Sequence, residues 1–374
     1  MKKIALIFGT RPEAIKLAPV YFSLKKSNLL TPLLWVTGQH QEMLLQTLES
    51  FGLTPEKNLE LMSKDQSLSI ITGKVVDKVS KLFESEKVDA VIVQGDTTSA
   101  FAVSLAAFYH KIPVIHVEAG LRTKTKTSPF PEELNRRLVS QIADYHFAPT
   151  AWAKENLLRE GVSKDVVWQT GNTVIDALQI IIEKVRLIQP KEISSDIIEK
   201  INSNKKIVLI TGHRRESFGD GFESLCEAIR ELSLQYKDFE FIYPAHLNPN
   251  VQEPVYRILS GHSNILLTRP LGYEAFVWLM DKSYFILSDS GGIQEEAPHL
   301  GKPVLVLRDS TERPEAIEAG TSKLVGTDKG SIIKNASLLL SDSNEYQKMS
   351  TASNPYGDGT SSEKIRTILE QVLG

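Results

Sequence analysis

The chain has 374 residues, 41% of them hydrophobic and 24% charged, and its 43 Lys and Arg nearly balance 46 Asp and Glu, for a formal charge of −3. This composition is typical of a globular protein of about two domains, each large enough for its own core, and it argues against a polybasic nucleic-acid binder. The single cysteine, Cys226, excludes an intramolecular disulfide and a cysteine-based zinc site. We expect it to be a core thiol in a helix over residues 222–232.

Short apolar runs, each followed by a Gly, Asp or Pro break and then by a longer segment with helical spacing, recur along the chain. This alternation predicts parallel strands covered by helices on both faces. In the first half, the predicted strands are residues 4–8, 33–37, 90–94, 114–117, 145–148 and 166–169. In the second half, they are residues 207–211, 240–243, 265–267, 284–287 and 304–307. The two series predict an α/β protein of two Rossmann-type, doubly wound lobes.

The boundaries of the predicted lobes follow from a change in composition. Residues 183–206 are charged and contain Pro190, so we expect them to connect an N-terminal lobe over 1–182 with a C-terminal lobe over 207–360. Residues 361–373 predict a terminal amphipathic helix capped by Ser361 or Ser362. The apolar run at 4–8 is too short for a signal peptide, and no stretch reaches the ~18 apolar residues of a membrane span. We therefore expect a cytoplasmic protein with no membrane partner.

The polar residues that follow the strands of the first lobe are candidates for chemistry, since open α/β sheets bind ligands there. Arg11 and Lys16 place two cations near a helix N-terminus, which predicts an anionic ligand; a solvated helix start is the alternative. Asp96 and Glu118 follow two further strands, and carboxylates beside arginines are suited to acid/base work. Asp96 could equally cap a helix in its Gly-Asp-Thr turn.

The second lobe offers groups suited to a nucleotide. His213 follows its first strand, and Ser290, Gly291 and Gly292 form a strand-to-helix junction where a phosphate could approach bare backbone N–H groups. Glu296, about one turn later, could accept hydrogen bonds from ribose hydroxyls. Arg313 lies beyond the next strand and strengthens this interpretation.

Several motifs are absent from the sequence. It contains no G-x-G-x-x-G after a strand and no G-x-x-x-x-G-K-[ST], which disfavours NAD and P-loop nucleotide hydrolysis. The eight histidines show no H-E-x-x-H or comparable spacing. We expect no cofactor and no metal.

Nine motifs spread over both predicted lobes carry a resemblance to the bacterial non-hydrolysing UDP-N-acetylglucosamine 2-epimerases. They are GTRPEAIK at 9–16, QGDTT at 94–98, HVEAGLR at 116–122, SPFPEELNRR at 128–137, TGNTVID at 170–176, GHRRE at 212–216, PAHLNP at 244–249, DSGGIQEE at 289–296 and TERPE at 311–315. The resemblance implies a GT-B-like fold with the site in the cleft between the lobes. It also implies that helix 361–374 packs back on the first lobe and that the chain forms a homodimer.

The resemblance implies roles for residues at matching positions. The catalytic set would be Asp96, Glu118, Glu132, Arg136 and His213. The substrate-binding set would be Arg11, Lys16, Asp96, Glu118, His213, Leu271, Phe276, Ser290, Gly291, Gly292, Glu296 and Arg313, with Leu271 standing where some members place Gln near the uracil. A second UDP-GlcNAc, bound as an allosteric activator, would contact Gln39, His40, Gln66, Arg214 and His246.

The implied reaction interconverts UDP-GlcNAc and UDP-ManNAc by anti elimination of UDP to 2-acetamidoglucal and re-addition, and it would supply ManNAc for surface polysaccharide. Which of the three carboxylates removes the C2 proton stays open. The rival interpretations are an epimerase of a related UDP-sugar, a hydrolysing epimerase, a GT-B glycosyltransferase and a UDP-sugar sensor.

Overall fold

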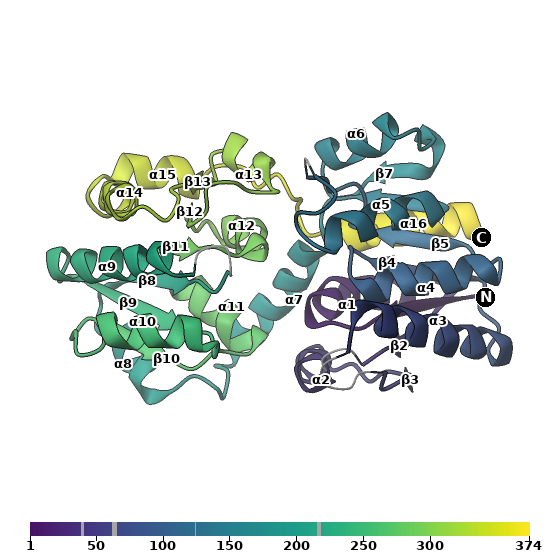
Figure 1. Ribbon diagram of the computed structural model, residues 1–374, viewed down its shortest axis with the longest axis horizontal. Helices are drawn as coiled ribbons and strands as arrows, with labels where there is room; N and C mark the ends of the chain where they lie inside the picture. Colours follow the sequence, from purple (N-terminus) through teal and green to yellow (C-terminus); the bar gives the residue numbers. More distant parts are fainter. Residues whose placement is uncertain (39–40, 62–65, 124, 215–217) are drawn as a thin grey trace. The chain divides into compact units, whose positions relative to one another are not determined.

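The computed structural model describes residues 1–38, 41–61, 66–123, 125–214 and 218–374, with the side chains of 41 and 42 left out. The chain divides into two compact units (Figure 1). The first unit consists of Met1–Ile180 and Tyr356–Gly374, and the second of Ile181–Pro355. The boundary lies within helix α7 (Thr173–Leu187), so residues 183–206 belong to the second unit.

The first unit is built on a seven-stranded sheet with the order β3-β2-β1-β4-β5-β6-β7, in which all neighbours are parallel. Its strands are β1 (Lys2–Phe8), β2 (Leu30–Val36), β3 (Lys57–Asn58), β4 (Ala90–Gln94), β5 (Val114–Val117), β6 (Tyr145–Ala148) and β7 (Val167–Gln169). Its other helices are α1 (Arg11–Lys25), α2 (Gln41–Ser50), α3 (Leu68–Ser85), α4 (Thr98–Tyr109), α5 (Glu132–Ile142), α6 (Ala151–Arg159), the short η1 (Lys164–Val166) and α16 (Ser361–Leu373).

Helices cover both faces of this sheet (Figure 1). Along β1, Ile4, Leu6 and Phe8 pack in one core with residues of α1 and α16, whereas Ala5 and Ile7 pack in a second core with α3 and α4. A strand whose two sides are both buried has no polar alternation, which is why the sequence shows continuous apolar runs.

The second unit has a six-stranded parallel sheet with the order β10-β9-β8-β11-β12-β13. Its strands are β8 (Lys206–Thr211), β9 (Phe239–Pro244), β10 (Ile265–Thr268), β11 (Phe285–Ser288), β12 (Val304–Val306) and β13 (Ser322–Leu324). Its helices are α8 (Ser195–Asn202), α9 (Asp220–Gln235), α10 (Pro249–Leu259), α11 (Tyr273–Lys282), α12 (Gly291–Glu296), η3 (Ala297–Leu300), α13 (Pro314–Glu318), α14 (Lys329–Ser341) and α15 (Ser343–Ser350). Two Rossmann-like sheets confirm the predicted fold class.

Among the described residues, the strand predictions missed β3 and β13, which lie at the edges of their sheets. Each has two or three mostly polar residues, KN in β3 and SKL in β13, so neither carries an apolar run. Cys226 is fully buried in α9, as predicted, and burial raises the pKa of its thiol to about 12.

The terminal helix α16 packs in the same core as β1 and α1 through Ile365, Leu369 and Leu373. The prediction that Ser361 or Ser362 caps this helix was wrong, because its N-cap residue is Thr360. Buried Asp176 of α7 accepts hydrogen bonds from the backbone N–H groups of Ser361 and Ser362 instead, at 3.2 and 2.7 Å. A carboxylate from another helix thus satisfies the first donors of α16.

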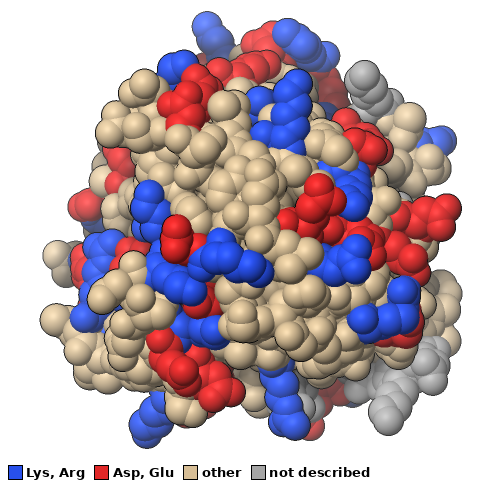
Figure 2. Space-filling model, turned by 90° about the vertical axis from the view of Figure 1, so that its left-hand side faces the viewer, with Lys and Arg blue, Asp and Glu red and all other residues tan. Residues whose placement is uncertain are grey.

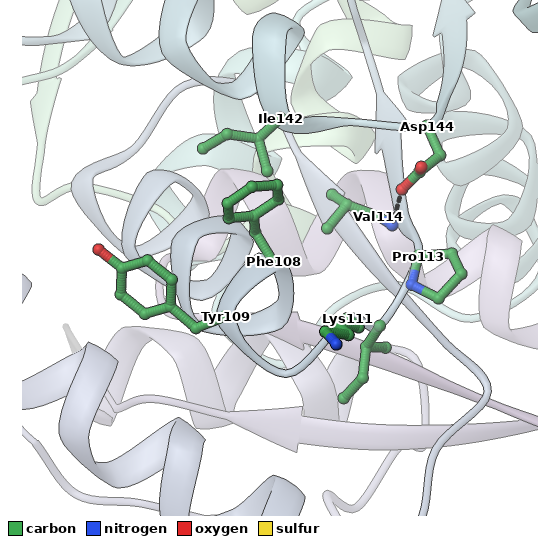
Figure 3. Close-up of a pocket in the computed structure, with 8 residues that line it drawn as sticks. Phe108, Tyr109, Lys111, Pro113, Val114, Ile142 and Asp144 are labelled. Carbon is green, nitrogen blue, oxygen red and sulfur yellow. Dashed lines mark hydrogen bonds between the residues drawn. The ribbon is translucent and has the colours of Figure 1, made fainter.

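None of the described helices is long and apolar enough to cross a membrane. On the face shown in Figure 2, Lys and Arg side chains are interspersed with Asp and Glu. A hollow of about 610 Å³ in the first unit is lined by Phe108, Tyr109, Lys111, Ile112, Pro113, Val114, Ile142 and Asp144 (Figure 3). It lies where β5 and β6 begin, at the end of the sheet opposite to that where such folds bind ligands.

Candidate functional site

Glu118 lies at the end of β5 and is the acceptor at the centre of a buried polar cluster. Lys16 of α1 pairs with its Oε1 at 2.5 Å, and Asn172 donates to the same oxygen at 3.0 Å. Gln94, the last residue of β4, donates to Oε2. Three elements of the first unit therefore orient one carboxylate, and Lys16 has an anionic partner within the protein.

The backbone at Glu118 is in the left-handed region, with φ of +61°. Such a conformation costs about 1–3 kcal/mol for a residue other than glycine and is often found at functional sites. Gly120, two residues later, has φ of +92°, and a Cβ there would lie 2.1 Å from the carbonyl oxygen of Ala153. The tight path of this loop on α6 therefore requires glycine at position 120.

Asp96 follows β4, and its carboxylate pairs with Arg136 of α5. Arg136 donates to Asp96 Oδ2 from Nε at 2.9 Å and from Nη2 at 2.5 Å. The alternative that Asp96 caps a helix is wrong, because Thr97 is the N-cap of α4 and its hydroxyl accepts from the N–H of Ala100 at 3.0 Å. The Asp96 carboxylate thus lies next to a fixed cation.

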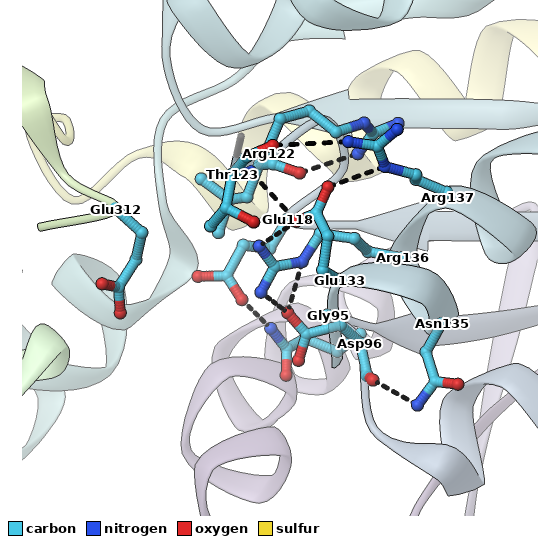
Figure 4. Close-up of polar contacts among 12 residues, drawn as sticks. Gly95, Asp96, Glu118, Arg122, Thr123, Glu133, Asn135, Arg136, Arg137 and Glu312 are labelled. Carbon is cyan, nitrogen blue, oxygen red and sulfur yellow. Dashed lines mark hydrogen bonds and ion pairs between the residues drawn. The ribbon is translucent and has the colours of Figure 1, made fainter. Parts of the chain in front are cut away.

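A second carboxylate fixes Arg136 from its other side (Figure 4). Glu133 is completely buried; it accepts from Arg136 Nη1 at 3.0 Å and from Arg137 Nε at 2.7 Å. Glu132, the first residue of α5, is only half-buried. Arg11 is exposed in the first turn of α1. The first unit thus brings Lys16 and Glu118 together, and Asp96 and Arg136 together.

Two buried histidines lie on the neighbouring strands β5 and β6. His116 of β5 makes a 2.8 Å hydrogen bond through Nε2 with the carbonyl oxygen of Gly95, and its ring centroid lies 6.4 Å from that of His146. Burial lowers the pKa of His116 to about 3, and the proximity of His146 adds to this shift. Burial likewise lowers the pKa of His146 to about 4. Both rings are therefore neutral near pH 7.

In the second unit, the loop after β8 is held by Asp289, which follows β11. Asp289 Oδ2 accepts from the backbone N–H groups of His213 at 2.7 Å and Arg214 at 2.8 Å. The His213 ring lies with Nδ1 3.5 Å from Asp289 Oδ1 and stacks on His246, with centroids 5.3 Å apart. The His213 side chain is 44% exposed.

Arg313 approaches the start of α12 at Gly291. A Cβ on Gly291 would lie 2.5 Å from Arg313 Nη1, so only glycine allows this approach. Arg313 donates to Glu295 at 2.7 Å and to Glu312 at 2.8 Å. Burial opposes the ionisation of Glu312, but Arg313, Arg308 and Arg214 outweigh it and hold its pKa at about 2. Ser290 and Gly292 flank Gly291 and are both half-buried.

Glu296, at the end of α12, accepts a 2.6 Å hydrogen bond from the hydroxyl of Tyr273 in α11. Phe276 of the same helix and Leu271, two residues before it, are half-buried. The second unit therefore brings Ser290, Gly291, Gly292 and Arg313 together, and it ties His213 to Asp289.

The chain is similar to proteins of one known family over nearly its whole length. Residues 23–370 match the family model described as UDP-N-acetylglucosamine 2-epimerase. A UDP-N-acetylglucosamine 2-epimerase of Campylobacter jejuni is 51% identical to this chain, and the match covers 99% of this chain and 97% of the relative. A UDP-N-acetylglucosamine 2-epimerase of Escherichia coli K12 is 50% identical, and the match covers 98% of both chains. The crystal structure of the Neisseria meningitidis enzyme bound to UDP-GlcNAc has 48% identity and a TM-score of 0.90, covering 99% of this chain and 100% of the other. The chain belongs to the UDP-N-acetylglucosamine 2-epimerase family.

Of the residues predicted for an allosteric pocket, Gln39 and His40 lie outside the described residues. Gln66 precedes α3 and is half-buried. Arg214 lies 3.6 Å from Glu312, and His246 stacks on His213. Among the described residues, no group of three or more His, Cys, Asp or Glu side chains could hold a metal ion.

Sequence reasoning missed several residues that orient the predicted ones. They are Glu13, Gln94, Asn172, Tyr273, Asp289 and Glu312. All except Tyr273 lie inside the motifs quoted above, so their motif membership was a signal that could have found them. Their partners come from other strands and helices, which no local pattern indicates.

Proposed function

We propose that this protein interconverts UDP-GlcNAc and UDP-ManNAc by eliminating UDP and adding it back. The observation that carries the proposal is the pair of carboxylates Asp96 and Glu118, which follow the neighbouring strands β4 and β5 and are each paired with a cation. Membership of the 2-epimerase family and the UDP-GlcNAc bound to the Neisseria meningitidis relative support this substrate.

The chemistry follows from the position of the proton that must move. The C2 proton of the sugar is not adjacent to a carbonyl group, so epimerisation at C2 needs a temporary activation of that carbon. We propose that a carboxylate removes this proton while UDP leaves from C1 on the opposite face of the sugar ring. UDP takes with it the electrons of the C1–O bond. The product is 2-acetamidoglucal, and re-addition of UDP with protonation of the other face gives the epimer.

Asp96, Glu118 and Glu132 are the proposed acid/base groups, and Arg136 and His213 are proposed to assist them. Arg136 fixes the direction of the Asp96 carboxylate because it donates two hydrogen bonds to one of its oxygens. Lys16 pairs with Glu118, which also accepts hydrogen bonds from the amides of Gln94 and Asn172. The environments of the two carboxylates therefore differ, which suits them to different steps.

The leaving diphosphate needs cations and N–H donors, since negative charge develops on it as the C1–O bond breaks. We propose that Arg11, Lys16, His213, Ser290, Gly291, Gly292 and Arg313 supply them. Phe276 and Leu271 would contact the uracil, and Glu296 the ribose. Support comes from the proximity of Arg313 to Gly291 within the second unit.

We further propose that the two units, 1–182 and 207–360 in the sequence prediction, close over the substrate, because an unprotected glycal would diffuse away. Gln39, His40, Gln66, Arg214 and His246 would bind a second UDP-GlcNAc that favours closure. Added UDP-GlcNAc would then be required for turnover of UDP-ManNAc. Ordinary hyperbolic kinetics in both directions would contradict this regulation.

We also propose a cytoplasmic homodimer that supplies ManNAc for surface polysaccharide. Phe108 and Tyr109, 61% and 63% exposed at the end of α4, support a protein contact, since exposed aromatic patches commonly mark interfaces. Light scattering after gel filtration measures the mass of the assembly. A monomer at micromolar concentration would contradict the homodimer.

One experiment tests the reaction. The protein is incubated in D2O with UDP-GlcNAc alone and followed by proton NMR. Deuterium at C2 together with newly formed UDP-ManNAc is the expected result. No exchange at C2 would refute the epimerase, and free ManNAc would indicate a hydrolysing enzyme. A glycosyltransferase would need an acceptor and leave the C2 proton in place.

A further inference from the structure

Each sheet has, near its centre, two neighbouring strands that are not consecutive in the chain. In the first, β1 neighbours β4, and in the second, β8 neighbours β11; these are the positions where the strand order along the sheet reverses direction. Such a reversal is where ligands bind in folds of this kind, because the loops that follow the two strands diverge. Each pair of diverging loops carries residues of the proposed site: Arg11 and Lys16 follow β1, Asp96 follows β4, and His213 follows β8.

In the first unit, a buried carboxylate joins the two loops. Glu13, 1% exposed, accepts from the N–H groups of Gly9 at 3.1 Å and Thr10 at 2.8 Å, and from the Thr10 hydroxyl at 2.7 Å. Its other oxygen accepts from the hydroxyl of Thr97 in the loop after β4 at 2.8 Å. Thr97 directly follows Asp96, so Glu13 connects the Gly9–Thr10 loop that precedes Arg11 with the loop bearing Asp96.

In the second unit, Asp289 connects the loop after β11, to which it belongs, with the loop after β8. It is 2% exposed, follows β11, and accepts from two successive N–H groups of the loop after β8, those of His213 and Arg214. Its second oxygen faces Nδ1 of His213 at 3.5 Å. One carboxylate therefore fixes the backbone at His213 and lies next to its ring.

Both groups are almost completely buried and spend their hydrogen bonds on the loops, so each acts through its neighbours. A carboxylate has two oxygens that only accept hydrogen bonds, and the contacts described for Glu13 all come from donors. An amide of the same shape would turn an NH2 group toward one of these donors. The acceptor geometry of these acids is thus matched to the N–H and O–H donors of the loops.

We propose that Glu13 and Asp289 are positioning residues, which align the diverging loops of their sheets so that Asp96, Arg11, Lys16 and His213 reach the geometry required by the reaction. This inference rests on the proposed function for its kinetic consequence. A displacement of about 1 Å in a reacting group costs on the order of 100-fold in rate, so small losses of alignment are measurable.

The test compares Glu13→Gln and Asp289→Asn with a matched control in each unit. Asp176→Asn replaces a buried carboxylate of the first unit that caps α16, and Glu240→Gln replaces one of the second unit that pairs with Lys200 and Lys205 at the start of β9. We expect kcat to fall about 10- to 100-fold in E13Q and D289N with KM changed less than about threefold. We expect kcat of the two controls to stay within about twofold of the unaltered protein.

Two further measurements complete the test. Amide hydrogen exchange should accelerate at Gly9 and Thr10 in E13Q and at His213 and Arg214 in D289N, but at neither loop in the controls. The ¹⁵N shifts of the His213 ring should show a changed tautomer in D289N, because Asn would present an N–H group to Nδ1. Circular dichroism establishes that each variant is folded.

Unchanged kcat in both variants, or an equal loss of kcat in the controls, would overturn the positioning role. Unchanged amide hydrogen exchange at the two loops would overturn the positioning role as well. Failure of the proposed function is a separate outcome, because the unaltered protein would then produce no UDP-ManNAc. The exchange and ¹⁵N measurements do not depend on the identity of the substrate.

Discussion

Arg136 donates two hydrogen bonds to a single carboxylate oxygen of Asp96, from Nε at 2.9 Å and from Nη2 at 2.5 Å, and thereby binds α5 to the loop after β4. The other oxygen, Oδ1, is not engaged by this guanidinium. A carboxylate held in this way is fixed in direction while one oxygen can still face a substrate.

Asp96→Asn is expected to lower kcat at least about 100-fold, because the amide cannot exchange a proton as a carboxylate does. The affinity for UDP, measured by calorimetry, should change less than about threefold. Asp77→Asn is the matched control, since Asp77 is an exposed residue of α3 that pairs with Lys81. Turnover of D96N within tenfold of the unaltered protein would refute its catalytic role.

Glu118→Gln is expected to abolish epimerisation and to leave UDP binding largely intact. The substitution removes the negative charge that Lys16 faces and directs an NH2 group at donors of the cluster formed with Gln94 and Asn172. NMR of UDP-GlcNAc in D2O measures the loss as missing exchange at C2. Glu155→Gln, on the exposed side of α6, should exchange C2 normally. Normal exchange in E118Q would remove Glu118 from the mechanism.

Gly291→Ala is expected to weaken UDP binding about tenfold or more, since the new Cβ would displace the Arg313 guanidinium 2.5 Å away. Glu295 and Glu312 hold this guanidinium, so it cannot move without losing hydrogen bonds. Calorimetric titration with UDP measures the affinity. Gly330→Ala in α14 is the control, because its Cβ would meet only Asp328 Oδ1 at 3.4 Å. Equal UDP affinity in G291A and G330A would contradict the proposed diphosphate contact.

The stability of the protein should fall as the pH drops below about 6.5, in part through His116. Burial, and to a smaller extent electrostatic repulsion from His146, lower the pKa of His116 from 6.5 to about 3 in the folded state. Between these values the unfolded chain binds the proton and the folded chain does not, so the free energy of unfolding decreases as pH falls, by roughly 1.4 kcal/mol per pH unit for each such group.

Urea denaturation at pH 7, 6 and 5 checks this expectation. His116→Gln removes the titrating group and should make the decline less steep than in the unaltered protein, even where its stability at pH 7 is lower. His110→Gln, at the C-terminal end of α4, serves as the comparison and should retain the steeper decline of stability with falling pH. Parallel curves for H116Q and the unaltered protein would contradict a neutral buried His116.

The sequence by itself determined the alternation of strands and helices and the location of the polar residues that follow the strands. Both depend on short-range properties: runs of apolar residues for strands buried on two faces, and Gly, Asp and Pro where the chain must turn. The strands β3 and β13 escaped prediction because they are short and mostly polar, whereas the edge strands β7 and β10 keep apolar residues and were predicted.

Only the tertiary structure decided which partners the site residues have. Asn172 meets Glu118 across 54 residues of sequence, and His213 meets Asp289 across 76. Asp96 turned out to pair with Arg136 rather than to cap α4. Such pairings are set by which strands lie side by side and by how their loops diverge, and hydrogen bonds depend on distances and directions in space that residue type and spacing leave undetermined.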